Sequence, residues 1–182
     1  MTDSGAGAAR TFADKWSRNP SLAFEQTVDE NAEISRWILT RNGFGTGDGL
    51  AAYLAEKKRI LDAGCGNGRV TALLQRHAPE GSEIVGIDLH AAEVARENLA
   101  GLPNVSIHQG DLLGDLSGLG RFDFIYCQEV LHHTGDPQSA LENLTSLLSP
   151  DGEIAIYVYR RKPPVREFTD DYLREREAKS ES

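Results

Sequence analysis

The sequence predicts an α/β protein with a doubly wound parallel sheet of five strands in the order 3-2-1-4-5, preceded by N-terminal helices. Two observations support this prediction. Between residues 58 and 160, short apolar runs alternate with segments of helical periodicity and are joined by short connections, as in a parallel sheet with helices on both faces. A glycine-rich turn, Gly64-Cys-Gly-Asn-Gly68, follows the first apolar run, where open α/β sheets bind their ligands.

The composition fits a single globular domain. The chain has 182 residues, of which 40% are hydrophobic and 26% charged, values typical of soluble proteins. A net charge of -9 argues against general nucleic-acid binding, which requires clustered Lys and Arg. No apolar run reaches the length of a membrane span, and the N-terminus lacks the pattern of a signal peptide, so we expect a cytoplasmic protein. Cys65 and Cys127 fit a reduced compartment.

The N-terminal part, residues 11–57, is expected to be helical and to follow a disordered stretch over residues 1–10. Three helices are expected there: Thr11–Trp16, about Ser21 to Arg41, and about Asp48 to Glu56. The second of these is supported by apolar residues at near-helical spacing, among them Phe24, Val28 and Trp37, and it is expected to end at Asn42-Gly43.

The expected strands are Arg59–Leu61, Glu83–Asp88, Asn104–Gln109, Phe122–Cys127 and Glu153–Tyr159. The helices between them are expected from the glycine turn to about His77, over Ala91–Ala100 and over about Pro137 to Leu148. Pro79 and Gly81 mark the end of the first of these helices, and Asp136 followed by Pro137 is a good N-cap and first residue for the last. The fourth strand is almost entirely apolar, which predicts a central position with both faces buried.

The spacing of the glycine turn indicates a ligand that carries positive charge. A dinucleotide-binding turn reads G-x-G-x-x-G and receives a pyrophosphate at the helix N-terminus. Here the glycines alternate, Arg69 takes the sixth place, and Asp62 stands two residues before the first glycine. A carboxylate there repels a pyrophosphate and attracts a cation. The turn therefore favours a nucleoside with a cationic tail, a description that S-adenosylmethionine fits.

The segment Leu61-Asp-Ala-Gly-Cys-Gly-Asn-Gly68 resembles motif I of the class I S-adenosylmethionine-dependent methyltransferases. Four further segments match this family in its own order. They are Gly86-Ile-Asp88-Leu, Gly110-Asp111-Leu, Phe122-Asp-Phe-Ile-Tyr-Cys-Gln-Glu-Val-Leu-His-His133 and Leu148-Ser-Pro-Asp-Gly-Glu-Ile154. The resemblance implies a Rossmann-like domain over residues 58–160, S-adenosyl-L-methionine as cofactor, and methyl transfer to a small-molecule acceptor that the sequence does not identify.

The resemblance also implies a set of cofactor-binding residues. They are Asp62, Gly64, Cys65, Gly66, Asn67, Gly68, Asp88, Leu89, Asp111, Leu112 and Gln128. In this assignment Asp62 favours the methionine ammonium group and Asp88, about twenty residues after the glycine turn, accepts from the ribose hydroxyls. Leu89 packs on the adenine, whose amino group donates to Asp111; a plain Asp-capped turn is the alternative for Asp111.

The catalytic candidates are Glu129, His132 and His133. They resemble the Glu-x-x-Glu-His segment of quinone-biosynthesis O-methyltransferases, where such groups hold a divalent ion. A histidine here replaces the second glutamate, which disfavours a hard cation, so no metal is expected. A general base or acceptor contact and a purely structural turn both remain open. Phe12 and Trp16 are candidates for substrate contact, or they pack the N-terminal helices onto the sheet.

The C-terminal tail, residues 161–182, departs from the family, which has two more strands after the fifth. The tail is highly charged, with a helical pattern from about Phe168 to Ala178. The fifth strand is therefore expected to leave an apolar edge. Three explanations for this edge are open: the chain is a truncated part of a longer enzyme, it forms a homodimer through the edge, or the tail covers the edge. A non-catalytic cofactor-binding or scaffold fragment of a longer methyltransferase is the alternative function.

Overall fold

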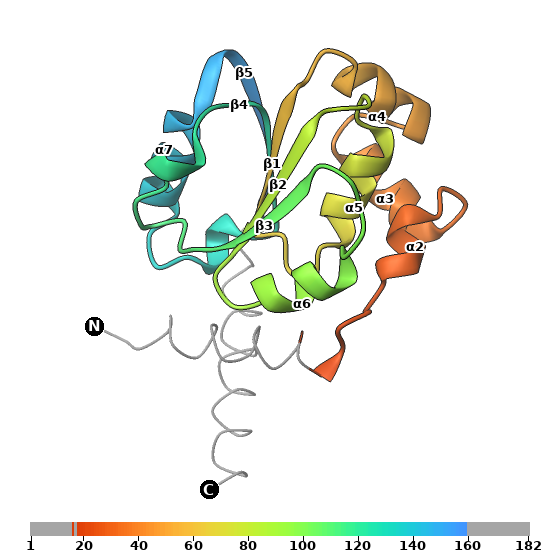
Figure 1. Ribbon diagram of the computed structural model, residues 1–182, viewed down its shortest axis with the longest axis horizontal. Helices are drawn as coiled ribbons and strands as arrows, with labels where there is room; N and C mark the ends of the chain where they lie inside the picture. Colours follow the sequence, from red (N-terminus) through yellow and green to blue (C-terminus); the bar gives the residue numbers. More distant parts are fainter. Residues whose placement is uncertain (1–15, 17, 160–182) are drawn as a thin grey trace, which may run out of the picture.

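The computed structural model describes residue 16 and residues 18–159. Its five strands form one sheet in the order β3-β2-β1-β4-β5 (Figure 1). The strands are β1 (Arg59–Ala63), β2 (Glu83–Asp88), β3 (Val105–Gln109), β4 (Phe122–Gln128) and β5 (Leu148–Tyr157). All four neighbouring pairs are parallel. The predicted fold class and strand order are confirmed.

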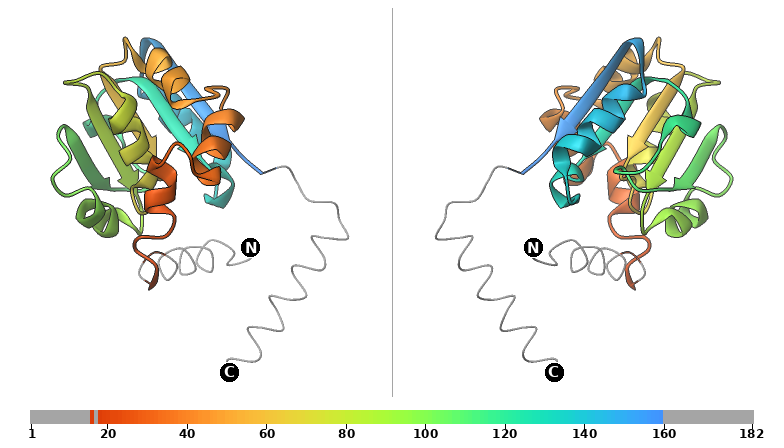
Figure 2. Two further views of the ribbon diagram at one scale, coloured as in Figure 1. Left: turned by 90° about the vertical axis from the view of Figure 1, so that its right-hand side faces the viewer. Right: turned by 90° about the vertical axis from the view of Figure 1, so that its left-hand side faces the viewer.

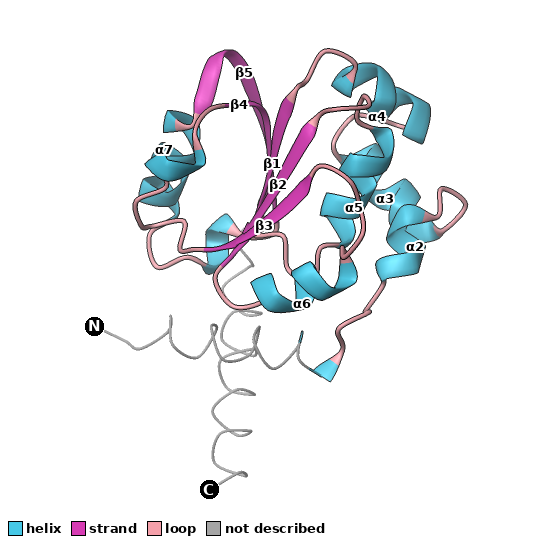
Figure 3. Ribbon diagram, viewed as in Figure 1, coloured by secondary structure: helices cyan, strands magenta, loops and turns pink. Residues whose placement is uncertain are grey.

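Helices cover both faces of the sheet. The α-helices are α2 (Phe24–Val28), α3 (Glu33–Arg41), α4 (Gly47–Leu54), α5 (Arg69–His77), α6 (Ala92–Asn98) and α7 (Pro137–Ser146), and the short 3-10 helices are η1 (Ser117–Leu119) and η2 (Leu131–His133). Helix α7 lies on one side of the sheet, and α3, α4 and α5 lie on the other (Figures 2 and 3). The chain runs outward from β1 through β2 to β3 and then, on the other side of β1, from β4 to β5. Because such crossovers are right-handed, the helices of the two halves lie on opposite faces.

Alternate residues of the central strands point into different cores. Ile60 of β1 packs with Phe124 of β4 in the core under α3, α4 and α5. Leu61 and Ile125, one position further along, pack in the core under α7. All four side chains are fully buried, which explains the almost continuous apolar sequence of β4. The alternation also turns the next residue of β1 after Leu61, an aspartate, toward α5.

The prediction of a single long helix from Ser21 to Arg41 is wrong. The structure has α2 and α3 there, separated at Asp29–Ala32. The Asp29 carboxylate accepts from the Asn31 backbone N–H at 3.0 Å, a local bond that competes with helix continuation. The apolar spacing persists on both sides of this break, so periodicity alone did not reveal it.

Several local predictions are confirmed. Asp136 accepts from the Ser139 backbone N–H at 3.1 Å and Pro137 is the first residue of α7, and α5 ends at His77. The fifth strand begins at Leu148, earlier than expected, and its pairing with β4 shifts register between Phe122 and Phe124. A bulge of this kind lets the turn at Pro150-Asp-Gly152 lie within the paired region.

Strand β5 forms one edge of the sheet. Ile156, Val158 and Tyr159 expose between 36% and 51% of their surface near this edge, so the homodimer through β5 stays a prediction. No helix in the described part of the chain is long and apolar enough to cross a membrane. The expected disorder over 1–10, the helix over most of 11–16, Phe12 and the tail over 161–182 lie outside the described residues.

Candidate functional site

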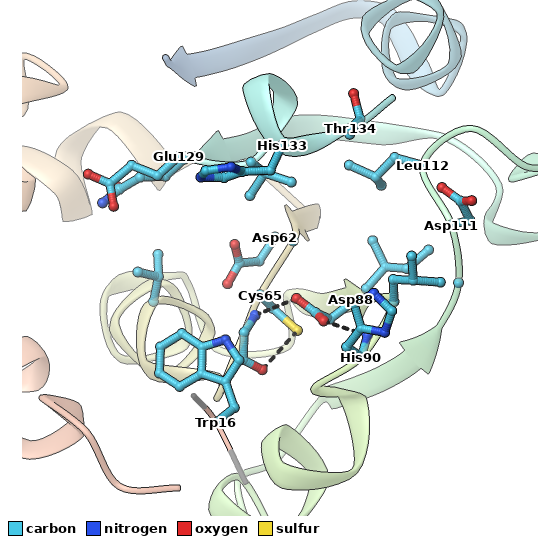
Figure 4. Close-up of a pocket in the computed structure, with 18 of the residues that line it drawn as sticks. Trp16, Asp62, Cys65, Asp88, His90, Asp111, Leu112, Glu129, His133 and Thr134 are labelled. Atoms are coloured by element: carbon cyan, nitrogen blue, oxygen red, sulfur yellow. Dashed lines mark hydrogen bonds between the residues drawn. The ribbon is translucent and has the colours of Figure 1, made fainter. Parts of the chain in front are cut away.

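A cavity of about 280 Å³ opens at the carboxyl ends of the strands. It lies where the connections run outward in opposite directions from β1 and β4, the usual ligand site of an open α/β sheet. The glycine turn after β1, the end of β2, the turn after β3 and the loop after β4 each supply part of its wall. Figure 4 shows Asp62 in the middle, Trp16 and the glycine turn on one side, and Glu129 and His133 on the other.

The glycine turn has a conformation that side chains would obstruct. Gly64 has a φ of +81°, and a Cβ there would lie 2.3 Å from Val130 Cγ2. Gly66 has a φ of +55°, and a Cβ there would lie 3.0 Å from the Trp16 ring. The Gly64 backbone N–H donates to the carbonyl of Ile87 on β2 at 2.7 Å. The backbone can therefore approach a ligand closely, and its position is fixed by the neighbouring strand.

Asp62 is a buried carboxylate at the floor of this cavity, with 3% of its surface exposed. Its Oδ2 accepts from the Thr71 hydroxyl of α5 at 2.7 Å. The pKa of Asp62 is raised to about 7, chiefly by burial and in smaller part by the nearby charge of Asp88, although the Thr71 hydrogen bond and the Arg69 guanidinium act to lower it. A carboxylate in this position gains a large stabilisation from a cation bound in the cavity.

Asp88 ends β2 and fixes the shape of the neighbouring loops. Its Oδ2 accepts from the Gly66 N–H at 2.9 Å. Its Oδ1 accepts from the His90 and Ala91 N–H groups at 2.9 and 2.8 Å. Since a carboxylate offers about four acceptor positions, these three bonds leave room for one more. One acceptor position is therefore left for a ligand, and the contact of Asp88 with the ribose hydroxyls stays a prediction.

The wall near β3 combines an acidic turn with apolar side chains. Asp111 lines the cavity, and its Oδ1 also accepts from the Leu113 N–H at 2.9 Å, so it caps the turn as well. Leu112 is buried, and Leu89 is 42% exposed at the rim of the cavity. Two leucines in the lining of one cavity suit a flat, apolar ring system.

Gln128 ends β4 and also lines the cavity. Its Oε1 accepts from the hydroxyl of Tyr126, which in turn accepts from Asn42 Nδ2 at 2.7 Å. The side-chain carbonyl is therefore engaged inside the protein. The amide nitrogen and the backbone of Gln128, together with the second lone pair of Oε1, are left for a ligand.

The opposite side of the cavity contains the Glu129 carboxylate. Glu129 has a φ of +59°, which is uncommon for a residue other than glycine. Its Oε1 accepts from Arg41 Nη1 at 2.8 Å. The Arg41 guanidinium lies 3.7 Å from the centre of the Trp37 ring and 4.0 Å from that of Tyr157. Rings and an ion pair thus hold Glu129 in place from α3 and β5.

The two neighbouring histidines differ in position. His133 lines the cavity, whereas His132 does not. The His132 ring lies 4.0 Å from that of His133 and 4.5 Å from that of Tyr159, measured between ring centres. Both His132 ring nitrogens are buried without a hydrogen-bond partner among the described residues, and burial lowers the pKa of His132. The described residues contain no cluster of three or more His, Cys, Asp or Glu suited to a metal ion.

Most of the residues predicted for the site lie on one cavity. Ten of the eleven cofactor-binding candidates line it, together with Trp16, Glu129 and His133. Gly68 does not line it. A Cβ at Gly68 would lie 2.6 Å from Leu99 Cδ1, so this glycine lets the end of α6 pack against the turn. Whether the lining residues bind the cofactor stays a prediction.

Two residues that shape the site were not predicted. Thr71 lies in the third position of α5, and a hydroxyl residue near the start of the helix was the available signal. Arg41 gave no signal, because its partner Glu129 is 88 residues away in the sequence. Arg69, noted only as the sixth residue of the turn, also lines the cavity.

Comparisons with known proteins point to one family. A family model described as a methyltransferase domain matches residues 61–154. The ubiquinone biosynthesis O-methyltransferase of Marinobacter nauticus is 33% identical over 112 residues, 58% of this chain and 46% of that protein. The trans-aconitate 2-methyltransferase of Deinococcus radiodurans is 35% identical over 111 residues, 60% of this chain and 42% of that protein. The chain thus spans less than half the length of these relatives.

A comparison with solved structures also finds a similar protein. The N-terminal domain of EvdMO1, crystallised with SAH bound, is 26% identical with a TM-score of 0.51. The match covers 62% of this chain and 48% of that one.

Proposed function

Because this chain belongs to the family of methyltransferase domains, we propose that it transfers the methyl group of S-adenosylmethionine to a small-molecule acceptor. The observation that carries the proposal is the convergence of Asp62 and Asp88 on one cavity beside a left-handed glycine turn. The names of the two relatives, an O-methyltransferase of ubiquinone biosynthesis and a trans-aconitate 2-methyltransferase, support a small acceptor. The SAH bound to EvdMO1 supports the cofactor.

The residues of the cavity fit S-adenosylmethionine. Asp62 offers a buried carboxyl group to the methionine ammonium group. The pKa of this carboxyl group, about 7, lies close to neutral pH. Asp88 has one acceptor position left for a ribose hydroxyl. Leu89, Leu112 and Asp111 line the cavity, which supports this wall as the site of the adenine. When bound, this cofactor supplies a methyl carbon activated by the adjacent sulfonium.

The protein's own contribution is to position the acceptor and to exclude water. Glu129 and His133 lie across the cavity from the glycine turn (Figure 4). Glu129, held by Arg41, accepts a hydrogen bond from an acceptor hydroxyl or amine. His133 lines the cavity, which supports a role for its imidazole as the base that takes the proton that the acceptor loses. His132, which does not line the cavity, supports the loop through its ring contacts.

Isothermal titration with S-adenosylmethionine and with S-adenosylhomocysteine tests the cofactor assignment. We expect saturable binding of both by the wild-type chain and weaker binding by Asp62→Asn. A chain that binds neither at millimolar concentration contradicts the proposal. A methyl-transfer assay then follows the formation of S-adenosylhomocysteine with phenolic, carboxylic and amine acceptors. Binding without transfer to any of them favours a non-catalytic fragment of a longer methyltransferase.

A further inference from the structure

Two asparagine side chains tie the segment before α2 to the glycine turn. Asn67 Nδ2 donates to the carbonyl oxygens of Pro20 and Leu22 at 3.0 and 3.1 Å. Asn98, the last residue of α6, donates from Nδ2 to the same Pro20 carbonyl at 2.8 Å and to the Asn67 carbonyl at 2.9 Å. Both N–H bonds of each amide are therefore used, and the Pro20 carbonyl accepts from both asparagines.

This network joins three parts of the chain that are distant in sequence. Asn67 lies in the turn after β1, Asn98 lies 31 residues further on, and Pro20 precedes both by 47 residues or more. Asn67 is completely buried, and its Oδ1 has no partner among the described residues. An unpaired buried oxygen is unfavourable. The two bonds from Nδ2 nevertheless hold this side chain in its orientation.

The same segment carries a wall of the cavity. Trp16 lies four residues before Pro20, and its ring lines the cavity against Gly66. In Figure 4 the indole faces the backbone beside Cys65, on the opposite side of the cavity from Glu129. Asn98 itself does not line the cavity. Its side-chain amide reaches the cavity wall through Asn67 and Pro20.

We propose that Asn67 and Asn98 are positioning residues. Their hydrogen bonds to the Pro20 carbonyl keep Trp16 against Gly66, and Trp16 completes the cavity wall on the side of the glycine turn. The part of this inference that concerns cofactor affinity rests on the proposed function. The part that concerns Trp16 does not. Loss of the Asn98 donors releases the segment, exposes the Trp16 ring to water and weakens cofactor binding without removing any group that contacts the cofactor.

The test uses the full chain and the variant Asn98→Asp. This change keeps the size of the side chain but places a carboxylate oxygen against two carbonyl oxygens that now receive N–H groups. The control is Glu97→Gln, one residue earlier on the exposed surface of α6. The chain has two tryptophans, Trp16 and Trp37. Each variant is therefore also measured with Trp16→Phe added, and the difference between the two measurements gives the fluorescence of Trp16. The measurements are acrylamide quenching without ligand, and titration with S-adenosylhomocysteine.

In the wild-type chain and in Glu97→Gln we expect a protected Trp16 and equal affinity. In Asn98→Asp we expect Trp16 quenching to rise at least twofold and the dissociation constant to rise about tenfold, roughly 1.4 kcal/mol. Circular dichroism checks that the variant is folded. If Asn98→Asp does not fold, Asn98→Ala, which removes the donors without adding charge, takes its place.

Each outcome decides one part of the inference. Unchanged Trp16 quenching in the folded variant overturns it. Exposed Trp16 with unchanged affinity overturns the link to the cofactor. A wild-type chain that does not bind S-adenosylhomocysteine contradicts the proposed function, while a rise in Trp16 quenching in the variant still supports the role of Asn98 in positioning the segment.

Discussion

The two sides of the cavity are held together in different ways. On the side of the glycine turn, the bonds that fix the two carboxylates are short-range: Asp62 and Thr71 are 9 residues apart, and Gly66 and Asp88 are 22 apart. On the side of Glu129, the fixing contact reaches back 88 residues to Arg41 and adds rings from α3 and β5. The carboxylates Asp62 and Asp88 are thus set by a single strand-turn-helix unit and its neighbour, to which the segment of Trp16 and Pro20 adds a wall. The side of Glu129, by contrast, exists only once distant elements have packed.

This difference separates two kinds of mutational effect. Changes near the glycine turn act on the cofactor and on the backbone of the core. Changes near Glu129 act on the packing of α3, β4 and β5 and leave the cofactor side largely intact. The following variants test that separation.

The largest expected effect concerns Asp62 and pH. Its pKa is raised from 3.8 to about 7 by burial. Between about pH 4 and pH 7 the native state therefore holds a proton that the unfolded chain has released, and the free energy of unfolding falls as pH rises. The total loss is on the order of 4 kcal/mol, at 1.36 kcal/mol per pKa unit. Urea denaturation at several pH values should show this decline in the wild type and its absence in Asp62→Asn.

The same carboxyl group links cofactor binding to pH. A bound ammonium group favours the ionised form of Asp62, so binding below pH 7 releases a proton and affinity rises toward neutral pH. Titration calorimetry in two buffers of different ionisation enthalpy measures that proton. Proton release that persists in Asp62→Asn would show that another group is responsible.

The second variant is Gly64→Ala, which acts at the start of the glycine turn. The left-handed φ costs an alanine about 1–2 kcal/mol, and overlap with Val130 at 2.3 Å adds about 1–3 kcal/mol. We expect a loss of about 3 kcal/mol in the free energy of unfolding and a loss of cofactor affinity. Gly101→Ala is the control, since Gly101 has a φ of +91° and nothing within 4 Å. Gly101→Ala should lose only the part of the free energy of unfolding that comes from the left-handed φ, about 1–2 kcal/mol. Equal losses in both variants would contradict the steric argument.

The third variant, Arg41→Met, breaks the other side of the cavity. It leaves the Glu129 carboxylate without its partner at 2.8 Å. Breaking a fully buried pair costs about 3–5 kcal/mol, and Glu129 retains 25% exposure of its side chain, so we expect about 2 kcal/mol. Arg96→Met removes a comparable but exposed pair with Glu93 and should cost less than about 1 kcal/mol. Denaturation and cofactor titration together should show lost stability with nearly unchanged cofactor affinity.

The sequence predicted the fold and one side of the cavity because both depend on local patterns. Strand order follows from the alternation of strands and helices, and the turn at Gly64 and the carboxylates at Asp62 and Asp88 lie within one short segment. The break at Asp29 depended on a side-chain bond that competes with the helix. The pair of Arg41 and Glu129 depended on tertiary packing. No pattern along the chain marks a contact of that range.

The smallest expected effect is at His132, which the sequence marked as a catalytic candidate. Both ring nitrogens are buried without a hydrogen-bond partner among the residues described. His132→Phe keeps the ring contacts with His133 and Tyr159 and removes two unpaired polar atoms, so stability should be unchanged or rise by up to about 1 kcal/mol.

Cofactor affinity of His132→Phe should stay within about twofold of the wild type, a change of under 0.5 kcal/mol. Asp62→Asn, measured in the same titration, shows that the assay detects a cofactor contact. A clear loss of affinity in His132→Phe would mean that the loop after β4 and the glycine turn are coupled through the cavity. The two sides would then have to be treated as one cooperative unit, because a residue that does not line the cavity would be acting across it.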